Sequence, residues 1–297
     1  MPGAAAPERC ATAAYPRIGR VAARRFAGRS ELSVDPDLRV YLSDLVRPYG
    51  VALREDLLER GVGHTYGEMA EELIRETVPE DGPVDLLILA YAVHDVRPGR
   101  STALYLGEVC PGRPMAFTVC DQGIAGPYTA VRLASEYLRT GDRVRALIIV
   151  AEQAALHYEP PTRPDTPVTL PDEHSAVAVL FEGVGATGLS AVREHAGIAP
   201  GEVPELLVAQ VSELAAGIDR GRRVLVLGGG LSKADAEGLG IDRIVAAPAG
   251  RPCTGVWHEL AQGHAQWSEH GDFVILADYD RQLRTLCLCA IETGGAS

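Results

Sequence analysis

The chain has 297 residues, of which 46% are hydrophobic and 23% are charged, and its formal net charge at pH 7 is -12. This length and composition predict a globular protein with a large buried core, and the acidic charge argues against generic binding to nucleic acid or anionic membranes. No apolar run approaches the roughly 18 residues of a membrane span, and the N-terminus lacks a signal-peptide core, so we expect a cytoplasmic protein.

The first half of the chain alternates predicted helices with predicted buried strands. Residues Val84–Val93 (VDLLILAYAV) form a continuous apolar run, which is typical of a strand buried on both faces. Further strands are expected at Met115–Val119, Val144–Ala151 and Ala176–Phe181, and helices at Glu55–Arg60, Glu68–Val78, Ser101–Leu106 and Pro127–Thr140. The proline-rich residues 157–172 predict a loop.

The second half repeats this order more weakly. Strands are expected at Val224–Leu227, Arg243–Ala247, Asp272–Ala277 and Thr285–Ile291, and helices at Glu202–Ala216, Lys233–Leu239 and Gly255–Glu269. Two halves rich in βαβ units suggest an internally duplicated α/β fold, which we divide into residues 1–185 and 186–297.

Neither a disulfide framework nor a metal site is expected. The cysteines contain no CxxC pair, and no pair of histidines has convincing zinc spacing. Cys287 and Cys289 alternate along the last predicted strand, so both should point to one face and pack in the core.

The most informative stretch runs from Ala116 to Glu152. It reads as a strand, a tight turn, a long amphipathic helix and a buried strand, and the turn contains Cys120, Asp121, Gln122 and Gly123. The N–H groups and dipole of a helix N-terminus favour a developing anion, so such turns often present a nucleophile.

The ordered motifs from about residue 65 onward resemble ketoacyl-ACP synthase III and the wider thiolase superfamily. They are VDLLILA, AFTVCDQGIAG, RALIIVAE, PDEHSAVAVLFEG, RVLVLGGGL, APAGRPCTGVW and the closing DFVILADYDRQLRTLCLCAIE. The resemblance implies a five-layer α/β/α/β/α fold and a homodimer paired through Met115–Val119. It also implies a thioester substrate on acyl carrier protein or CoA, whose phosphopantetheine is a substrate carrier; no bound cofactor is expected.

The resemblance does not extend to the family's catalytic Cys, His and Asn. The Cys position falls on Gly123 or Ile124, the His position on Gly228, and the Asn position on Pro252 or Cys253. The family's Gly-rich hairpin is replaced by residues 280–282, which read Asp-Arg-Gln. Claisen condensation by the usual route is therefore not expected.

Other residues near the turn are candidates for replacement chemistry. Cys120 is a candidate nucleophile, with a buried thiol as the alternative reading. Asp121 is a candidate proton acceptor, and its alternative role is the N-cap of the next helix. His94 follows a buried strand and is a candidate partner of these two residues. The candidate substrate-binding residues are Gln122, His174, Gly228, Gly229 and Cys253.

Two functions remain open on the sequence. The first is a divergent acyl-processing enzyme of specialised metabolism that transfers an acyl group to an oxygen or nitrogen nucleophile or to water. The second is a non-catalytic partner subunit, similar to a chain-length factor, which would form a heterodimer with another ketosynthase and shape its tunnel.

Overall fold

The computed structural model describes residues 15–30, 32, 35–97, 101–140, 145–159, 170–185, 188–218 and 221–294. Its strands form two five-stranded sheets with the orders β1-β5-β4-β2-β3 and β6-β10-β9-β7-β8. The first sheet contains β1 (Tyr15–Phe26), β2 (Leu86–Ala90), β3 (Met115–Val119), β4 (Arg145–Glu152) and β5 (His174–Gly185). The second contains β6 (Gly188–Ala196), β7 (Arg223–Leu227), β8 (Arg243–Ala246), β9 (Phe273–Asp280) and β10 (Thr285–Glu292).

The two sheets have the same topology. In the first, β2 pairs in parallel with β3 and β4, whereas β5 is antiparallel to both β4 and β1. In the second, β7 pairs in parallel with β8 and β9, whereas β10 is antiparallel to both β9 and β6. The predicted duplication is therefore present in the strand order, although it is not visible as sequence identity.

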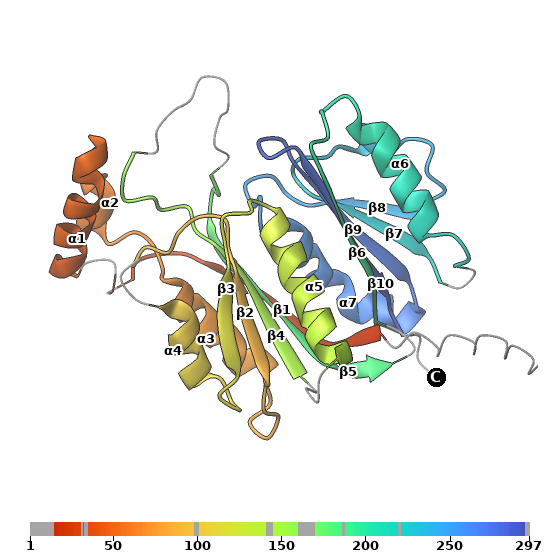
Figure 1. Ribbon diagram of the computed structural model, residues 1–297, viewed down its shortest axis with the longest axis horizontal. Helices are drawn as coiled ribbons and strands as arrows, with labels where there is room; N and C mark the ends of the chain where they lie inside the picture. Colours follow the sequence, from red (N-terminus) through yellow and green to blue (C-terminus); the bar gives the residue numbers. More distant parts are fainter. Residues whose placement is uncertain are drawn as a thin grey trace, which may run out of the picture.

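Helices cover both faces of each sheet and make five layers (Figure 1). The central layer holds α5 (Ala125–Thr140) and α7 (Gly255–His270), whose buried side chains join residues of both sheets in one core cluster. On the outer face of the first sheet lie α3 (Tyr66–Thr77) and α4 (Thr102–Val109), and α6 (Val203–Leu214) packs on the second. The expected α/β/α/β/α fold is confirmed.

Local sequence signals set several of these boundaries. A capping box begins α3, because the side chain of Thr65 accepts from the N–H of Glu68 and the Glu68 carboxylate accepts from the N–H of Thr65. Ser101 caps α4 as expected. Cys287 and Cys289 are fully buried in the core cluster between the sheets, which also confirms their prediction.

The N-terminal region contains two elements that the sequence did not predict, β1 and α1 (Pro36–Val46), whereas the helix expected at Glu55–Arg60 is present as α2. Strand β1 closes one edge of the first sheet. Helix α1, a short 3₁₀ turn at Arg47–Tyr49 and α2 form a small unit beside the main body (Figure 1). Strand β6 was also missed. In the loop predicted over residues 157–172, residues 160–169 lie outside the described residues. A further short 3₁₀ helix, η3 (Lys233–Ala236), follows β7.

Candidate functional site

The turn between β3 and α5, which we call the elbow, comprises residues 120–124. Two of its residues have left-handed backbone angles, with φ of 61° at Asp121 and 52° at Gly123. Glycine adopts this region freely, but an L-residue such as aspartate is held there at a cost of about 1–2 kcal/mol. Backbone strain of this kind is concentrated at functional sites, so Asp121 is a strong candidate for a functional residue.

The elbow brings together three side chains that the sequence had selected. The thiol of Cys120 donates to Asp121 Oδ2 at 3.2 Å, and Asp121 Oδ1 lies 3.8 Å from His94 Nε2. His94 follows β2, which pairs in parallel with β3, so the carboxyl ends of the two strands present these residues at the same edge. The Asp121 and His94 side chains are 70% and 59% exposed, which leaves them open to a substrate.

Asp121 does not cap the following helix. Helix α5 begins at Ala125, so its N-cap position is Ile124, and Asp121 lies three residues before that position. The side chain is directed to Cys120 and His94 instead. The capping alternative is therefore wrong, and the functional alternative remains.

Cys120 is a poor nucleophile in this environment. Burial, followed by the hydrogen bond to Asp121, raises the pKa of its thiol. Because the thiolate is the reactive form, a raised pKa disfavours covalent chemistry at this sulfur. A hydrogen bond from Tyr91 acts in the opposite direction and lowers the pKa of the Cys120 thiol. Burial raises the pKa of Tyr91 itself to about 12. At neutral pH, Cys120 is a thiol that donates to Asp121.

Carboxylates occupy the places where the resemblance puts the catalytic Cys and His of the ketoacyl-ACP synthase III family. A Cβ on Gly123 would meet the carboxylate of Asp280, and a Cβ on Gly228 would meet the carboxylate of Asp278. Both acids lie at the end of β9. Asp280 Oδ2 accepts from the N–H of Ile124 at 3.3 Å, and its Oδ1 accepts from two N–H groups of its own turn at 2.9 Å.

Glu152, at the end of β4, is a third acid in this region. Its carboxylate accepts from the N–H of Cys253 at 2.8 Å, from the hydroxyl of Ser175 at 3.2 Å and from the hydroxyl of Thr254. Burial raises the pKa of Glu152 to about 7 and that of Asp278 to about 7. A carboxylic acid whose pKa lies near neutrality is suited to proton transfer. The raised pKa also shows that the charged carboxylate is costly to bury.

The sequence reading missed these acids, although a signal was available. Glu152 ends the otherwise apolar strand RALIIVAE, and Asp278 directly follows the apolar residues 273–277 near the end of β9, in ADYD. A buried strand that ends in a carboxylate places that group at the edge of the sheet where sites gather.

The other predicted substrate-binding residues are divided between the elbow region and more distant positions. Cys253 is buried with its Sγ 4.0 Å from the Gly123 carbonyl, and burial raises its pKa. Gln122 accepts at 2.6 Å from Thr129 on α5. Gly229 is exposed, with nothing within 4 Å of the point where its Cβ would lie.

His174 is a buried structural residue. Its Nδ1 accepts from the N–H of Ala154 at 3.2 Å, and its ring packs against His64 with 5.7 Å between centroids. Burial, with the neighbouring His64 and His157, lowers the pKa of His174 to about 4, so the ring is neutral at physiological pH. These contacts tie His174 to the protein interior and not to the elbow.

Neither a metal centre nor a membrane helix is found in the described part of the chain. Its His, Cys, Asp and Glu side chains form no group of three or more suited to hold a metal ion. None of its helices is both long and apolar enough to cross a membrane.

Comparison with known proteins identifies the fold. No family model matches the sequence, and no curated protein matches it. Among solved structures, the tetronic acid condensing enzyme AbyA1 aligns with a TM-score of 0.63 and 19% identity, over 93% of this chain and 99% of that one. ChlB3, named an acyltransferase, aligns with a TM-score of 0.63 and 17% identity, over 95% and 98%.

The 3-oxoacyl-(acyl carrier protein) synthase III of Pseudomonas aeruginosa PAO1 aligns equally well. Its TM-score is 0.63 at 15% identity, over 94% of this chain and 98% of the synthase. At this level of identity the likeness concerns the fold. The chain therefore has the thiolase-like fold of the ketoacyl-ACP synthase III enzymes.

Proposed function

We propose that this protein is a divergent acyl-processing enzyme that transfers an acyl group from a CoA or acyl carrier protein thioester to an oxygen or nitrogen nucleophile or to water. The observation that carries the proposal is the strained Asp121, whose carboxylate contacts both His94 and Cys120 at the elbow. The fold shared with a condensing enzyme and an acyltransferase supports the substrate class and a place in specialised metabolism.

The geometry suits direct transfer without an acyl-enzyme. Asp121 orients the ring of His94, which removes the proton from the acceptor O–H or N–H. The acceptor oxygen or nitrogen then forms a bond to the thioester carbonyl carbon as the carbon–sulfur bond breaks. His94 returns the proton to the leaving sulfur, so the step balances without an additional reactant. Cys120 remains a thiol and holds Asp121 in place through its hydrogen bond.

The first experiment measures thiol release from a panel of short and long acyl-CoA thioesters, with and without alcohol or amine acceptors. We expect wild-type turnover, and a loss of about 10²-fold or more for His94→Ala, the usual effect of removing a general base. His270→Ala is the matched control. It lies at the far end of α7, about 24 Å along the helix from the N-terminus near the elbow, and should retain turnover. No thiol release by the wild type with any thioester would contradict the proposal.

A second candidate function is favoured by a separate observation. The carboxylates of Asp280 and Asp278 occupy the space that side chains on Gly123 and Gly228 would need. This arrangement is suited to a partner subunit that keeps the fold but not the reaction, and that shapes the tunnel of another ketosynthase. Activity only upon co-expression with a second synthase subunit would support this function.

A further inference from the structure

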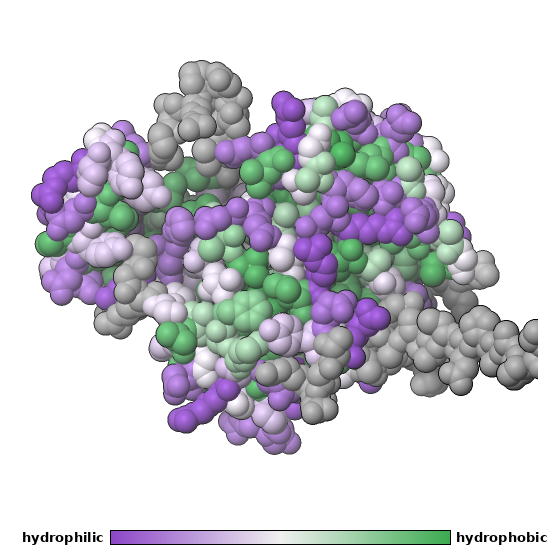
Figure 2. Space-filling model, in the orientation of Figure 1, coloured by the Kyte–Doolittle hydropathy of each residue, from purple (hydrophilic) through white to green (hydrophobic). Residues whose placement is uncertain are grey.

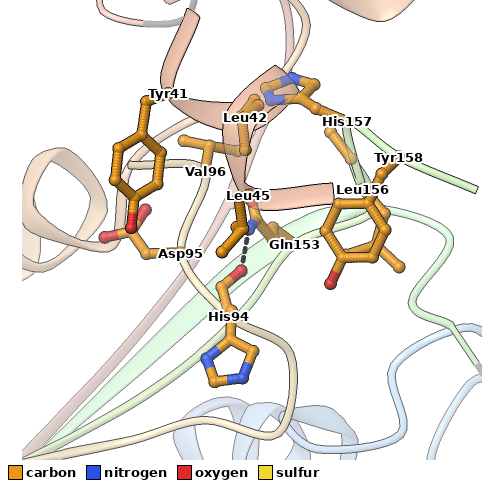
Figure 3. A pocket seen from close by; sticks show the side chains of 11 residues that line it. Tyr41, Leu42, Leu45, His94, Asp95, Val96, Gln153, Leu156, His157 and Tyr158 are labelled. Atoms are coloured by element: carbon orange, nitrogen blue, oxygen red, sulfur yellow. Dashed lines mark hydrogen bonds between the residues drawn. The ribbon is translucent and has the colours of Figure 1, made fainter. Parts of the chain in front are cut away.

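A cavity of about 290 Å³ lies where α1 rests against the main body of the protein (Figure 3). Three separate segments form its wall: α1, the segment after β2 that contains His94, and the segment after β4. At about 30 Å³ for each water molecule, the volume corresponds to about ten waters. This size suits a small organic molecule or a short chain.

The unit that closes the cavity has its own small core. Leu38 and Leu42 of α1 pack against Leu58 of α2, apart from the main clusters. An ion pair of 2.8 Å between Arg97 and Asp35 ties the start of α1 to the segment after β2. The N–H of Arg54 donates to the carbonyl of His157 at 2.9 Å, which joins the unit to the segment after β4.

Gln153 gives the cavity wall a buried hydrogen-bond acceptor without a partner among the described residues, beside the rings of Tyr41 and Tyr158 (Figure 3). The residue is only 1% exposed, and its Nε2 donates to the main-chain carbonyl of His94, as the dashed line in Figure 3 shows. A carbonyl can only accept, so this bond fixes which end of the amide is the nitrogen. Gln153 Oε1 is then left buried in the cavity wall with no donor among the described residues.

The rest of the wall determines the character of a ligand. Leu42, Leu45 and Val96 contribute apolar surface. The one carboxylate of the wall, Asp95, is already engaged by the hydroxyl of Thr102 at 2.9 Å and by main-chain N–H groups. Burial lowers the pKa of His157, so its ring is neutral at pH 7. The cavity therefore offers no free charge to a ligand.

We propose that this cavity is a binding site for a small, uncharged and mainly apolar molecule that carries one hydroxyl or N–H group, which donates to Gln153 Oε1. A buried acceptor without a donor is costly, and a ligand donor would satisfy it while the apolar body fills the remaining volume. The inference goes beyond the proposed acyl transfer, because no step of that reaction uses Gln153. It holds whether or not the elbow is catalytic.

Two isomers test the proposal on the whole chain. 1-Octanol and heptyl methyl ether contain the same atoms, but only the alcohol has a donor. By isothermal titration calorimetry we expect saturable binding of 1-octanol about tenfold tighter than that of the ether, the usual effect of one net hydrogen bond. In Gln153→Met, which keeps the side-chain length but lacks the carbonyl, the two isomers should bind alike.

A pair of α1 variants tests the location. Leu45 lines the cavity, whereas Val40 lies on the same helix, is 63% exposed and does not line it. Leu45→Trp should abolish binding of 1-octanol, and Val40→Trp should leave it unchanged, with circular dichroism confirming that both fold. The proposal is overturned if the wild type binds neither isomer saturably or both equally, if Gln153→Met keeps the preference, or if the two tryptophan variants lose binding to the same extent.

Discussion

The carboxylate of Asp280 occupies the space that a side chain on Gly123 would fill. Gly123 belongs to the elbow of the first sheet, whereas Asp280 ends β9 of the second, so the two halves of the fold meet at this point. The N–H of Ile124 donates to Asp280 Oδ2 at 3.3 Å and fixes the contact. A glycine at position 123 is therefore required by both its neighbour and its positive φ.

Gly123→Ala should destabilise the protein. An alanine at a φ of 52° is strained by about 1–2 kcal/mol, and its Cβ would collide with the Asp280 carboxylate. At about 2–4 °C for each kcal/mol, we expect a loss of several degrees in melting temperature, measured by calorimetry. Leu283, the other close neighbour, has a 46% exposed side chain that can move aside.

A double-mutant comparison separates the collision from the backbone strain. In an Asp280→Gly background, Gly123→Ala should cost only the strain, whereas in an Asp280→Asn background of the same shape the full cost should remain. An equal cost of Gly123→Ala in the wild-type and Asp280→Gly backgrounds would show that Asp280 does not fill this space.

Asp121→Asn should lower turnover by about 10²-fold or more without loss of stability, if the elbow is catalytic. Asparagine tolerates the left-handed backbone as well as aspartate does, so the strained turn is retained. It has no negative charge to orient and stabilise His94, whose Nε2 lies 3.8 Å from Asp121 Oδ1. Initial rates of thiol release and a thermal melt of the same preparation measure the two effects.

The matched control for Asp121→Asn is Asp37→Asn, at an exposed position in the first turn of α1. This variant should retain both turnover and melting temperature. Wild-type turnover in Asp121→Asn would remove Asp121 from the mechanism, and a large fall in its melting temperature would assign the residue a structural role.

The buried Glu152 should make stability depend on pH. Its pKa is raised in the folded state from 4.5 to about 7, so the folded state holds this proton more tightly than the unfolded state does. The contribution is complete below pH 4.5 and is lost as the pH rises through about 7, by an amount on the order of 3 kcal/mol.

Urea unfolding of the wild type and Glu152→Gln between pH 5 and pH 8 isolates this contribution from the other titrating groups. The free energy of unfolding of the wild type should fall relative to that of the variant as the pH increases. Curves that remain parallel over this range would show that Glu152 does not titrate there. Asp278→Asn should behave like Glu152→Gln, because burial also raises the pKa of Asp278 to about 7.

The sequence predicted a duplicated α/β fold because the first half contains long apolar runs and the second half repeats their order more weakly, and the resemblance to ketoacyl-ACP synthase III implied the five layers. Val84–Val93 is an example, and residues 86–90 of this run form β2, which pairs with β4. The reading failed where periodicity is weak. Strand β1 carries several arginines, and β6 reads as GLSAVREHA, a half-buried pattern without a strong alternation. The division of the chain at residue 185 stays a prediction.

The candidate site was only partly predictable. His94 and Asp121 could be expected to meet because they follow adjacent parallel strands, and they lie 3.8 Å apart. The contacts of Asp280 with the elbow residues Gly123 and Ile124, and of Glu152 with Cys253, join residues more than 100 positions apart in sequence. Such contacts depend on how the two sheets pack around α5 and α7, which local sequence patterns do not encode.

The edge of the first sheet provides a last prediction, which concerns the homodimer that the resemblance implies. Strand β3 lies at the end of its sheet, with β2 as its neighbour on one side. Large exposed apolar side chains lie on β3 itself, at Met115, and on the neighbouring α4, at Leu104 and Tyr105. Figure 2 shows hydrophobic surface over the region where Figure 1 draws β3 and its flanking helices. An open strand edge beside apolar surface favours pairing with a second copy.

The direction of the main-chain groups makes this edge testable. The N–H of Met115 donates to Asp85 and the carbonyl of Val119 accepts from Tyr91, so alternate residues, including Thr118, direct their N–H to the open edge. Thr118→Pro removes an edge donor without removing a bond to β2. By sedimentation velocity we expect the wild type and Thr118→Val to be dimers and Thr118→Pro to be a monomer. A dimer that survives Thr118→Pro would place the interface elsewhere. A wild-type chain that sediments as a monomer until a ketosynthase is added would instead favour the partner-subunit function.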